Sequence, residues 1–155
     1  MLLLILSISA IGCTFKIGSI TIHNFMVTSK KPSRYYYTNY LLRDLNLDSA
    51  VNIKLLDTNF YKEKDLTKED IDTVKNFAKA LKKSNFIDKP KDLAEKPSYK
   101  LFLSLDKNKY IINVYTEQYI SVYPWDGKYS MDYIDMSGIQ NLYNLYGLCK
   151  YLIPR

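Results

Sequence analysis

Residue types on which many catalytic and cofactor sites depend are scarce in this chain of 155 residues, which has 5 glycines, 2 cysteines and a single histidine, His23. With one histidine and no G-x-S-x-G motif, no Ser-His-Asp grouping can activate a serine. The few glycines form no phosphate-cradling loop, and His23 has no Cys, Asp or Glu at metal-ligand spacing. Folding could still bring together a pair of carboxylates such as Asp126 and Asp132. We nevertheless expect a protein that is not an enzyme and has no metal and no cofactor.

A long apolar run is also absent. The most apolar segment is the short leader, residues 1–12, with the sequence MLLLILSISAIG. Twelve residues are too few for a membrane-spanning helix, which needs about 20. The uncharged segment matches the apolar core and small-residue end of a secretory signal. A plain secretory signal, or an N-terminal core strand, is the alternative to the more specific interpretation that follows.

The residues SAIGC, which end at Cys13, resemble the lipobox of bacterial lipoproteins. In that family a signal peptidase cuts before the cysteine, and the thiol then carries diacylglycerol. Gly12 and Cys13 match the pattern, whereas Ala10 stands where leucine is usual. The basic residues that normally begin such a leader are missing, which a true start upstream of Met1 would explain. The resemblance implies a lipoprotein signal peptide over residues 1–12 and a lipid at Cys13.

Two acyl chains on Cys13 would give stable attachment, because one chain alone binds a membrane only marginally. We therefore expect a protein on the extracytoplasmic face of the cell membrane, with residues 13–34 as anchor and linker. A strand could form within this linker. The other cysteine, Cys149, falls on an apolar helix face, which favours a buried thiol. A Cys13–Cys149 disulfide is the alternative.

The net charge of +6 and the 15 tyrosines are the features present in excess. A basic cytosolic protein would be a natural partner for nucleic acid, but the leader argues against that compartment, so we expect no nucleic-acid partner. Tyrosine provides contact area at low entropic cost. Its abundance therefore indicates a binding surface, or else a bias of composition that acts on the whole chain.

Hydrophobic periodicity predicts a single α+β domain over residues 35–155. Four segments of alternating apolar residues between 99 and 134 predict an antiparallel four-stranded meander. Helices over about 67–83 and 137–152 should pack on one face of it, and residues 50–57 should add a strand. Capping residues are expected at Thr67 for the first helix and at Ser137 or Asp135 for the last. A shorter helix is expected over 35–47 with Ser33 as its N-cap, and 86–96 should be a connection.

Alternation along the strands assigns two faces to the meander, because successive side chains point to opposite sides. The expected inner set is Tyr99, Leu101, Leu103, Leu105, Tyr110, Ile112, Val114, Ile120, Val122, Tyr129, Met131 and Tyr133. Asp132 and Ile134 are expected on the outer face.

The outer face also carries Tyr115, Tyr119 and Tyr123, and it ends at the turn that holds Trp125. In this turn Pro124 presets φ and Gly127 should permit a positive φ. An exposed Trp125 beside the tyrosines could stack on a sugar or grip a peptide. The alternative is that Trp125 folds back and closes the end of the sheet.

Several motifs resemble a family of small, uncharacterised lipoproteins of Gram-positive anaerobes, known as a domain of unknown function. They are NFIDKPKDL at 85–93, YIINVY at 110–115, YISVYPWDG at 119–127 and MDY at 131–133. The resemblance implies the same lipobox leader, and it supplies neither an activity nor site residues.

The sequence thus predicts a membrane-anchored, non-catalytic module that binds a protein or a cell-wall polymer through its outer sheet face. A second hypothesis is an accessory or structural component of a cell-envelope complex. That component would act through the basic side of helix 67–83, with Lys75 and Lys79, although such a lysine stripe is often only a solvated face.

Overall fold

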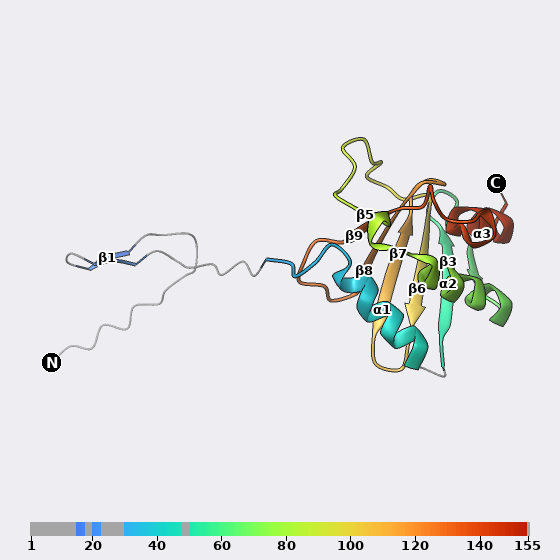
Figure 1. The fold of residues 1–155 in the computed structure, drawn as a ribbon, viewed down its shortest axis with the longest axis horizontal. Helices are drawn as coiled ribbons and strands as arrows, with labels where there is room; N and C mark the ends of the chain where they lie inside the picture. Colours follow the sequence, from blue (N-terminus) through green and yellow to red (C-terminus); the bar gives the residue numbers. More distant parts are fainter. Residues whose placement is uncertain (1–14, 18–19, 23–29, 48–49, 155) are drawn as a thin grey trace. The chain divides into compact units, whose positions relative to one another are not determined.

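The computed structural model describes residues 15–17, 20–22, 30–47 and 50–154, and it divides the chain into units Met1–Lys30 and Lys31–Arg155 (Figure 1). The predicted signal peptide, Cys13 and His23 lie outside the described residues. In the first unit, β1 (Phe15–Ile17) pairs antiparallel with β2 (Ile20–Ile22). The expected strand within the linker is therefore one arm of a short hairpin.

The second unit contains a sheet of seven antiparallel strands in the order β4-β3-β6-β7-β8-β9-β5. The strands are β3 (Asn52–Asp57), β4 (Glu63–Asp65), β5 (Phe86–Ile87), β6 (Tyr99–Ser104), β7 (Lys109–Val114), β8 (Tyr119–Pro124) and β9 (Asp132–Asp135). The α+β class and the meander β6–β9 are confirmed, but four strands describe the sheet too narrowly. Strand β3 extends it on one side, and the short edge strands β4 and β5 were not predicted.

Helices cover one face of this sheet (Figure 1). They are α1 (Tyr36–Leu47), α2 (Lys68–Ala80) and α3 (Leu145–Leu152), with the 3₁₀ turns η1 (Lys83–Asn85) and η2 (Asn141–Tyr143). Helix α1 packs on β8 and β9 and against α2, and α2 also contacts α3 and η2. The helices and the sheet face beneath them form the core.

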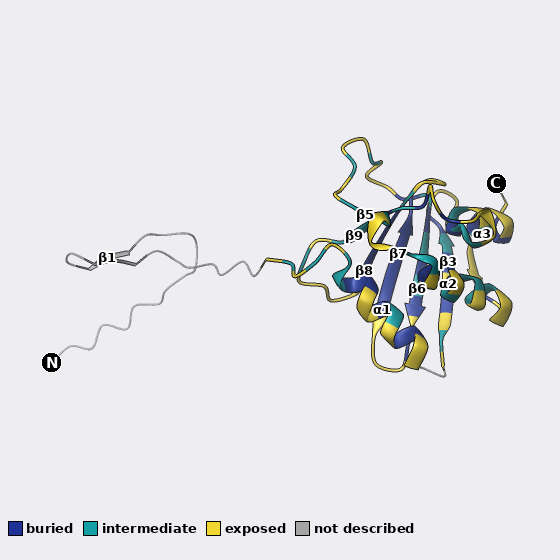
Figure 2. Cartoon of the chain, viewed as in Figure 1, coloured by how far each residue is buried: buried dark blue, intermediate teal, exposed yellow. Residues whose placement is uncertain are grey.

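The core is made by the inward side chains of alternate strand residues. On the sheet these are Ile53, Leu55, Tyr99, Leu101, Leu103, Tyr110, Ile112, Val114, Ile120, Val122 and Ile134; from the helices come Leu41, Leu45, Val74, Phe77, Leu145 and Cys149. Figure 2 colours the buried positions of the sheet and helices dark blue. Burying each large apolar side chain contributes about 1.5–3 kcal/mol. The predicted inner faces of β6, β7 and β8 and the burial of Cys149 are confirmed.

The last strand of the meander presents the opposite faces from those predicted. Asp132 pairs with Val122 and Ile134 pairs with Ile120, so both point inward, and Tyr133 points outward. The inward prediction for Met131 and Tyr133 is wrong. A shift of one residue exchanges the two faces of a strand. Here it is tolerated because the buried Asp132 has hydrogen-bond and ion-pair partners in the core.

Helix α2 begins as predicted, with Thr67 and Asp70 forming a reciprocal capping box. The last helix, α3, does not begin where predicted, because it starts at Leu145. Its N-cap is Asn144, whose Oδ1 accepts hydrogen bonds from the N–H groups of Tyr146 and Gly147. Asp135 instead holds a local turn by accepting from Ser137 N at 2.8 Å. Side-chain capping of a non-helical turn is the alternative that Asp offers the backbone.

Two further local predictions are wrong for identifiable reasons. Helix α1 begins at Tyr36, too far along the chain for Ser33 to cap it, and Asp132 accepts the hydrogen bond from Thr38 N in its first turn. The turn at Pro124 does form, with Gly127 N donating to Pro124 O, but Gly127 has no positive φ. A Cβ at Gly127 would lie 3.0 Å from the Tyr37 hydroxyl, so this position is restricted by close packing.

The far end of α1 is fixed to the sheet through Asp44. Its Oδ2 accepts hydrogen bonds from the Tyr110 hydroxyl at 2.6 Å and from Asn108 Nδ2 at 2.7 Å, and its Oδ1 accepts from Arg43. Burial alone would raise the pKa of Asp44, but these hydrogen bonds outweigh burial and hold the pKa below its usual value. The ionised carboxylate is therefore the form that the fold stabilises.

We expect Asp44→Asn to lower the free energy of unfolding at pH 7, by about 1–2 kcal/mol, because hydrogen bonds to a charged group are lost. An acid whose pKa is depressed by folding contributes stability above its unfolded pKa, here 3.8, and loses it as the pH falls through the folded pKa. The gap between parent and variant, measured by urea unfolding, should therefore shrink from pH 5 to pH 2. Asp88→Asn, at an exposed position, is the control, and a gap that stays constant with pH would contradict this account.

Candidate functional site

The face of the sheet opposite the helices carries a group of tyrosines around one small residue, Ser121. Strand register places Asn113 and Tyr133 directly across from Ser121. Tyr119 and Tyr123 lie two positions away along β8 on the same face, and the N–H of Tyr115 donates to the Tyr119 carbonyl. We call Tyr115, Tyr119, Tyr123 and Tyr133 the tyrosine face. Ser121 at its centre is fully buried although no helix lies above it.

The floor beneath the tyrosine face is polar. Asn113 Nδ2 donates to Ser121 Oγ at 3.2 Å, and the Tyr115 hydroxyl lies 3.5 Å from the same oxygen. The thioether of Met131 lies over this pair, with Sδ 3.3 Å from Ser121 Oγ and 3.7 Å from Asn113 Nδ2. Among the described residues, Asn113 Oδ1 is buried without a hydrogen-bond partner. The floor therefore has an acceptor to offer.

The hydroxyl groups of Tyr123 and Tyr133 remain protonated. Burial is the main cause that raises the pKa of Tyr123 and of Tyr133, and the neighbouring Tyr115 adds to it in both cases. Protonated phenols can both donate and accept a hydrogen bond. The face therefore combines ring surfaces with neutral hydrogen-bonding groups.

The structure brings together three of the four residues predicted as a binding face and places the fourth beside them. Tyr119 and Tyr123 are partly exposed, whereas Tyr115 is 8% exposed and mainly supports its neighbours. Trp125 is 69% exposed, so it does not fold back over the end of the sheet. Its N–H donates to Lys109 O at 3.0 Å, which continues the β8 ladder and by alternation puts Trp125 on the side of Tyr123.

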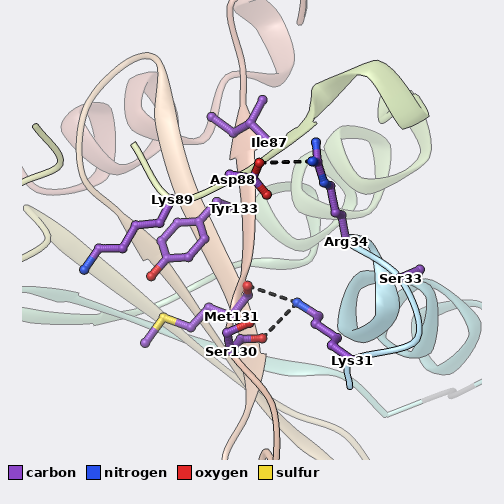
Figure 3. Close-up of a pocket in the computed structure, with 9 residues that line it drawn as sticks. All are labelled: Lys31, Ser33, Arg34, Ile87, Asp88, Lys89, Ser130, Met131 and Tyr133. Carbon is purple, nitrogen blue, oxygen red and sulfur yellow. Dashed lines mark hydrogen bonds and ion pairs between the residues drawn. The ribbon is translucent and has the colours of Figure 1, made fainter. Parts of the chain in front are cut away.

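A pocket of about 360 Å³ opens beside the tyrosine face (Figure 3). It is lined by Tyr133 of that face and by Met131, which covers the floor. Its other lining residues come from the start of the unit, from β5 and the loop after it, and from the segment before β9: Lys31, Ser33, Arg34, Ile87, Asp88, Lys89 and Ser130. Arg34 and Asp88 form an exposed ion pair at 3.0 Å. Figure 3 shows Lys89 extended alongside the ring of Tyr133.

Lys31 lines one side of this pocket, and its ammonium group is held in place by contacts with residues 130–132. Nζ donates to the carbonyls of Ser130 at 2.8 Å and Met131 at 3.0 Å, and it lies 2.5 Å from Asp132 Oδ1. Asp132 Oδ2 accepts from Thr38 N at 2.7 Å and from Thr38 Oγ1 at 2.9 Å. Burial raises the pKa of Asp132, against the opposing influence of Lys31 and Thr38. Asp132 is thus committed to structure, and the suggested carboxylate pair with the exposed Asp126 gains no support.

Comparison with known proteins gives the chain a family. The family described as "Domain of unknown function (DUF4883)" matches residues 31–149. The chain belongs to this family. The match begins at the first residue of the second unit, and it bears out the resemblance read from the motifs as far as a family of unknown function.

One solved relative of this DUF4883 chain extends the comparison. It is described as "Crystal Structure of Putative Lipoprotein from Clostridium perfringens", is 36% identical and superposes with a TM-score of 0.72. The alignment covers 81% of the present chain and 100% of the clostridial one. A search of curated proteins finds no match. The comparisons establish family and fold, and they carry no site residues.

Sequence reasoning missed several parts of this candidate site. Tyr133 and Met131 were placed inward, and the significance of Asn113 and Ser121 depends on cross-strand neighbours that a single sequence does not reveal. Across the described ranges, no group of three His, Cys, Asp or Glu residues could hold a metal ion. No helix in the described part of the chain is long and apolar enough to cross a membrane.

We expect Asp132→Asn to lower the free energy of unfolding by about 3 kcal/mol. The substitution removes one partner of the ion pair and leaves the ammonium group of Lys31 buried without its counter-charge. Lys31 is 15% exposed and Asp132 is 0% exposed. Chemical denaturation followed by circular dichroism measures the effect. Asp88→Asn, which breaks the exposed pair with Arg34, should cost less than about 1 kcal/mol. Equal losses in the two variants would contradict the structural role of Asp132.

Proposed function

We propose that this protein is a lipid-anchored module on the extracytoplasmic face of the cell membrane and that it binds a partner on its tyrosine face. The anchor would be a diacylated Cys13. The observation that carries this part is the 36% identity to a protein described as a "putative lipoprotein", over the whole of that protein's chain. The lipobox-like residues Ala10–Cys13 supply the matching attachment point.

Binding on the tyrosine face is supported by what that face contains. A sheet face left open to water is usually polar in an antiparallel sheet. Here Phe102, Tyr119, Tyr123 and Tyr133 are partly exposed on the side without helices, and Trp125 is exposed beside them. Aromatic side chains are over-represented among residues that dominate binding energy. The proposal is therefore for a binding module and not for an enzyme.

The anchor is tested by Cys13→Ala, which should release the chain into the medium or leave its leader uncleaved, because the thiol that carries the lipid is gone. Membrane fractionation and metabolic labelling with a fatty acid measure this. Cys149→Ala is the matched control, since it removes the other cysteine, which is buried in the core, and it should leave fractionation and labelling unchanged. A Cys13→Ala chain that remains with the membrane as the parent does would rule out the lipid anchor.

The face is tested by Tyr119→Ala and Trp125→Ala, each of which should weaken binding to purified cell envelopes by about tenfold or more, the loss typical of a dominant aromatic contact. Tyr151→Ala on α3 is the control, because Tyr151 is 81% exposed and lies on a helix on the other side of the sheet. Circular dichroism verifies that each variant is folded. Unchanged envelope binding in both folded face variants would exclude this surface.

A further inference from the structure

We propose that the tyrosine face binds an anionic glycan, whose sugar rings stack on the tyrosines while its acidic groups approach Lys89 and Lys100. The inference rests on the proposed function, because it names the ligand class of the same face. It does not depend on the anchor at Cys13, so binding in solution tests it separately.

The first argument is the polar floor. The Asn113 side chain forms hydrogen bonds with Ser121 and Tyr123, but its Oδ1 is buried without a partner among the described residues, next to the central Ser121. A buried polar atom left without a partner costs about 1–3 kcal/mol. A sugar hydroxyl provides the missing donor, and its ring presents C–H groups to the flanking tyrosine rings. A bilayer or an apolar protein surface would leave Asn113 unsatisfied, so these occupants are disfavoured.

The second argument is the distribution of charge. Strand register sets Lys100 beside Asn113 in one row, followed by Ser121, Tyr133 and Ile87. Lys89 follows two residues after Ile87 and so lies near that end of the row, while beyond Lys100 the register continues to Leu56 and to Glu63, which is paired with Lys54. The outer positions of β6, β7 and β8 hold Lys100 and Lys109 and no acidic residue. None of the ion pairs found among the described residues involves Lys89 or Lys100. These ammonium groups are available to an anionic ligand.

The third argument concerns access to the floor. Met131 covers Ser121 and Asn113, but it makes only weak sulfur contacts with them. Methionine is unbranched and adapts readily to a changed surrounding. Rotation of Met131 toward the adjacent 360 Å³ pocket would open the floor without movement of the backbone. The pocket and the tyrosine face then form one continuous site.

The test uses the full chain in a neutral detergent and isothermal titration calorimetry with three probes. These are maltohexaose, the same oligosaccharide phosphorylated at its 6-hydroxyls, and polyphosphate of equal charge. The phosphorylated sugar should bind at least tenfold more tightly than either other probe, and more weakly as salt is added, because ring stacking and charge act together.

Paired variants assign the site. Lys89→Gln with Lys100→Gln should weaken binding of the phosphorylated sugar by about tenfold, whereas Lys75→Gln with Lys79→Gln, an equal change of charge on α2, should not. Tyr133→Ala should weaken it by about tenfold, and Tyr133→Phe, which keeps the ring, should retain most of it. Tyr151→Ala is the aromatic control. Circular dichroism excludes misfolding as the cause.

Three outcomes would overturn the inference. Equal losses in the α2 control would show attraction by net charge alone. Equal binding of maltohexaose and its phosphorylated form, lost in Tyr133→Ala but not in the lysine pair, would make the ligand a neutral glycan and leave the binding face intact. Binding of an acidic peptide or of anionic vesicles, with no binding of the phosphorylated sugar, would assign the face to another class of partner.

Discussion

The contact on which the domain most depends is the one between Lys31, Asp132 and Thr38. The buried carboxylate of Asp132 forms an ion pair with the side chain of Lys31, the first residue of the unit. It also accepts hydrogen bonds from Thr38 in the first turn of α1. Because Asp132 is the first residue of β9, these contacts join the neighbouring residues Lys31 and Thr38 to a strand that begins 94 residues after Thr38. They also fix the direction of β9, since Asp132 can be buried only where those partners meet it. Tyr133 must then face outward, and the tyrosine face follows from an ion pair on the other side of the sheet.

Most of the scaffold can be read from the sequence because it follows from local periodicity. Strands β6, β7 and β8 alternate cleanly, and α2 has both an apolar stripe and a capping box within its own residues. Errors occur where a distant partner decides the outcome. The edge strands β4 and β5 contain only three and two residues and are held by pairing with β3 and β9. The predicted start of α3 is too early, because the capping pattern of Asp135 and Ser137 stabilises a turn and not a helix.

The site was predictable only in part, for the same reason. Alternation along β7 and β8 puts Tyr115, Tyr119 and Tyr123 on one side, and the turn leaves Trp125 exposed. Which side chains lie between those rings depends on the residues paired across the strands. Register supplies the small Ser121 at the centre and Tyr133 across from it. Hydrophobicity alone assigns the inward and outward faces of β9 wrongly. It takes no account of the buried Asp132, whose carboxylate is paired with Lys31 and Thr38.

The position at which the chain enters the domain has a mechanical consequence. Tension along the residues before Lys31 would be transmitted at this point, and the side chain there is bonded to Asp132 and to the carbonyls of Ser130 and Met131. Part of the load would therefore pass into the segment that leads into β9, and from there across the sheet through the pairing of β9 with β8, while the backbone carries the rest into α1. That same segment carries Met131 over the floor of the tyrosine face. The same few residues would thus carry tension from the chain before Lys31 and cover the polar floor.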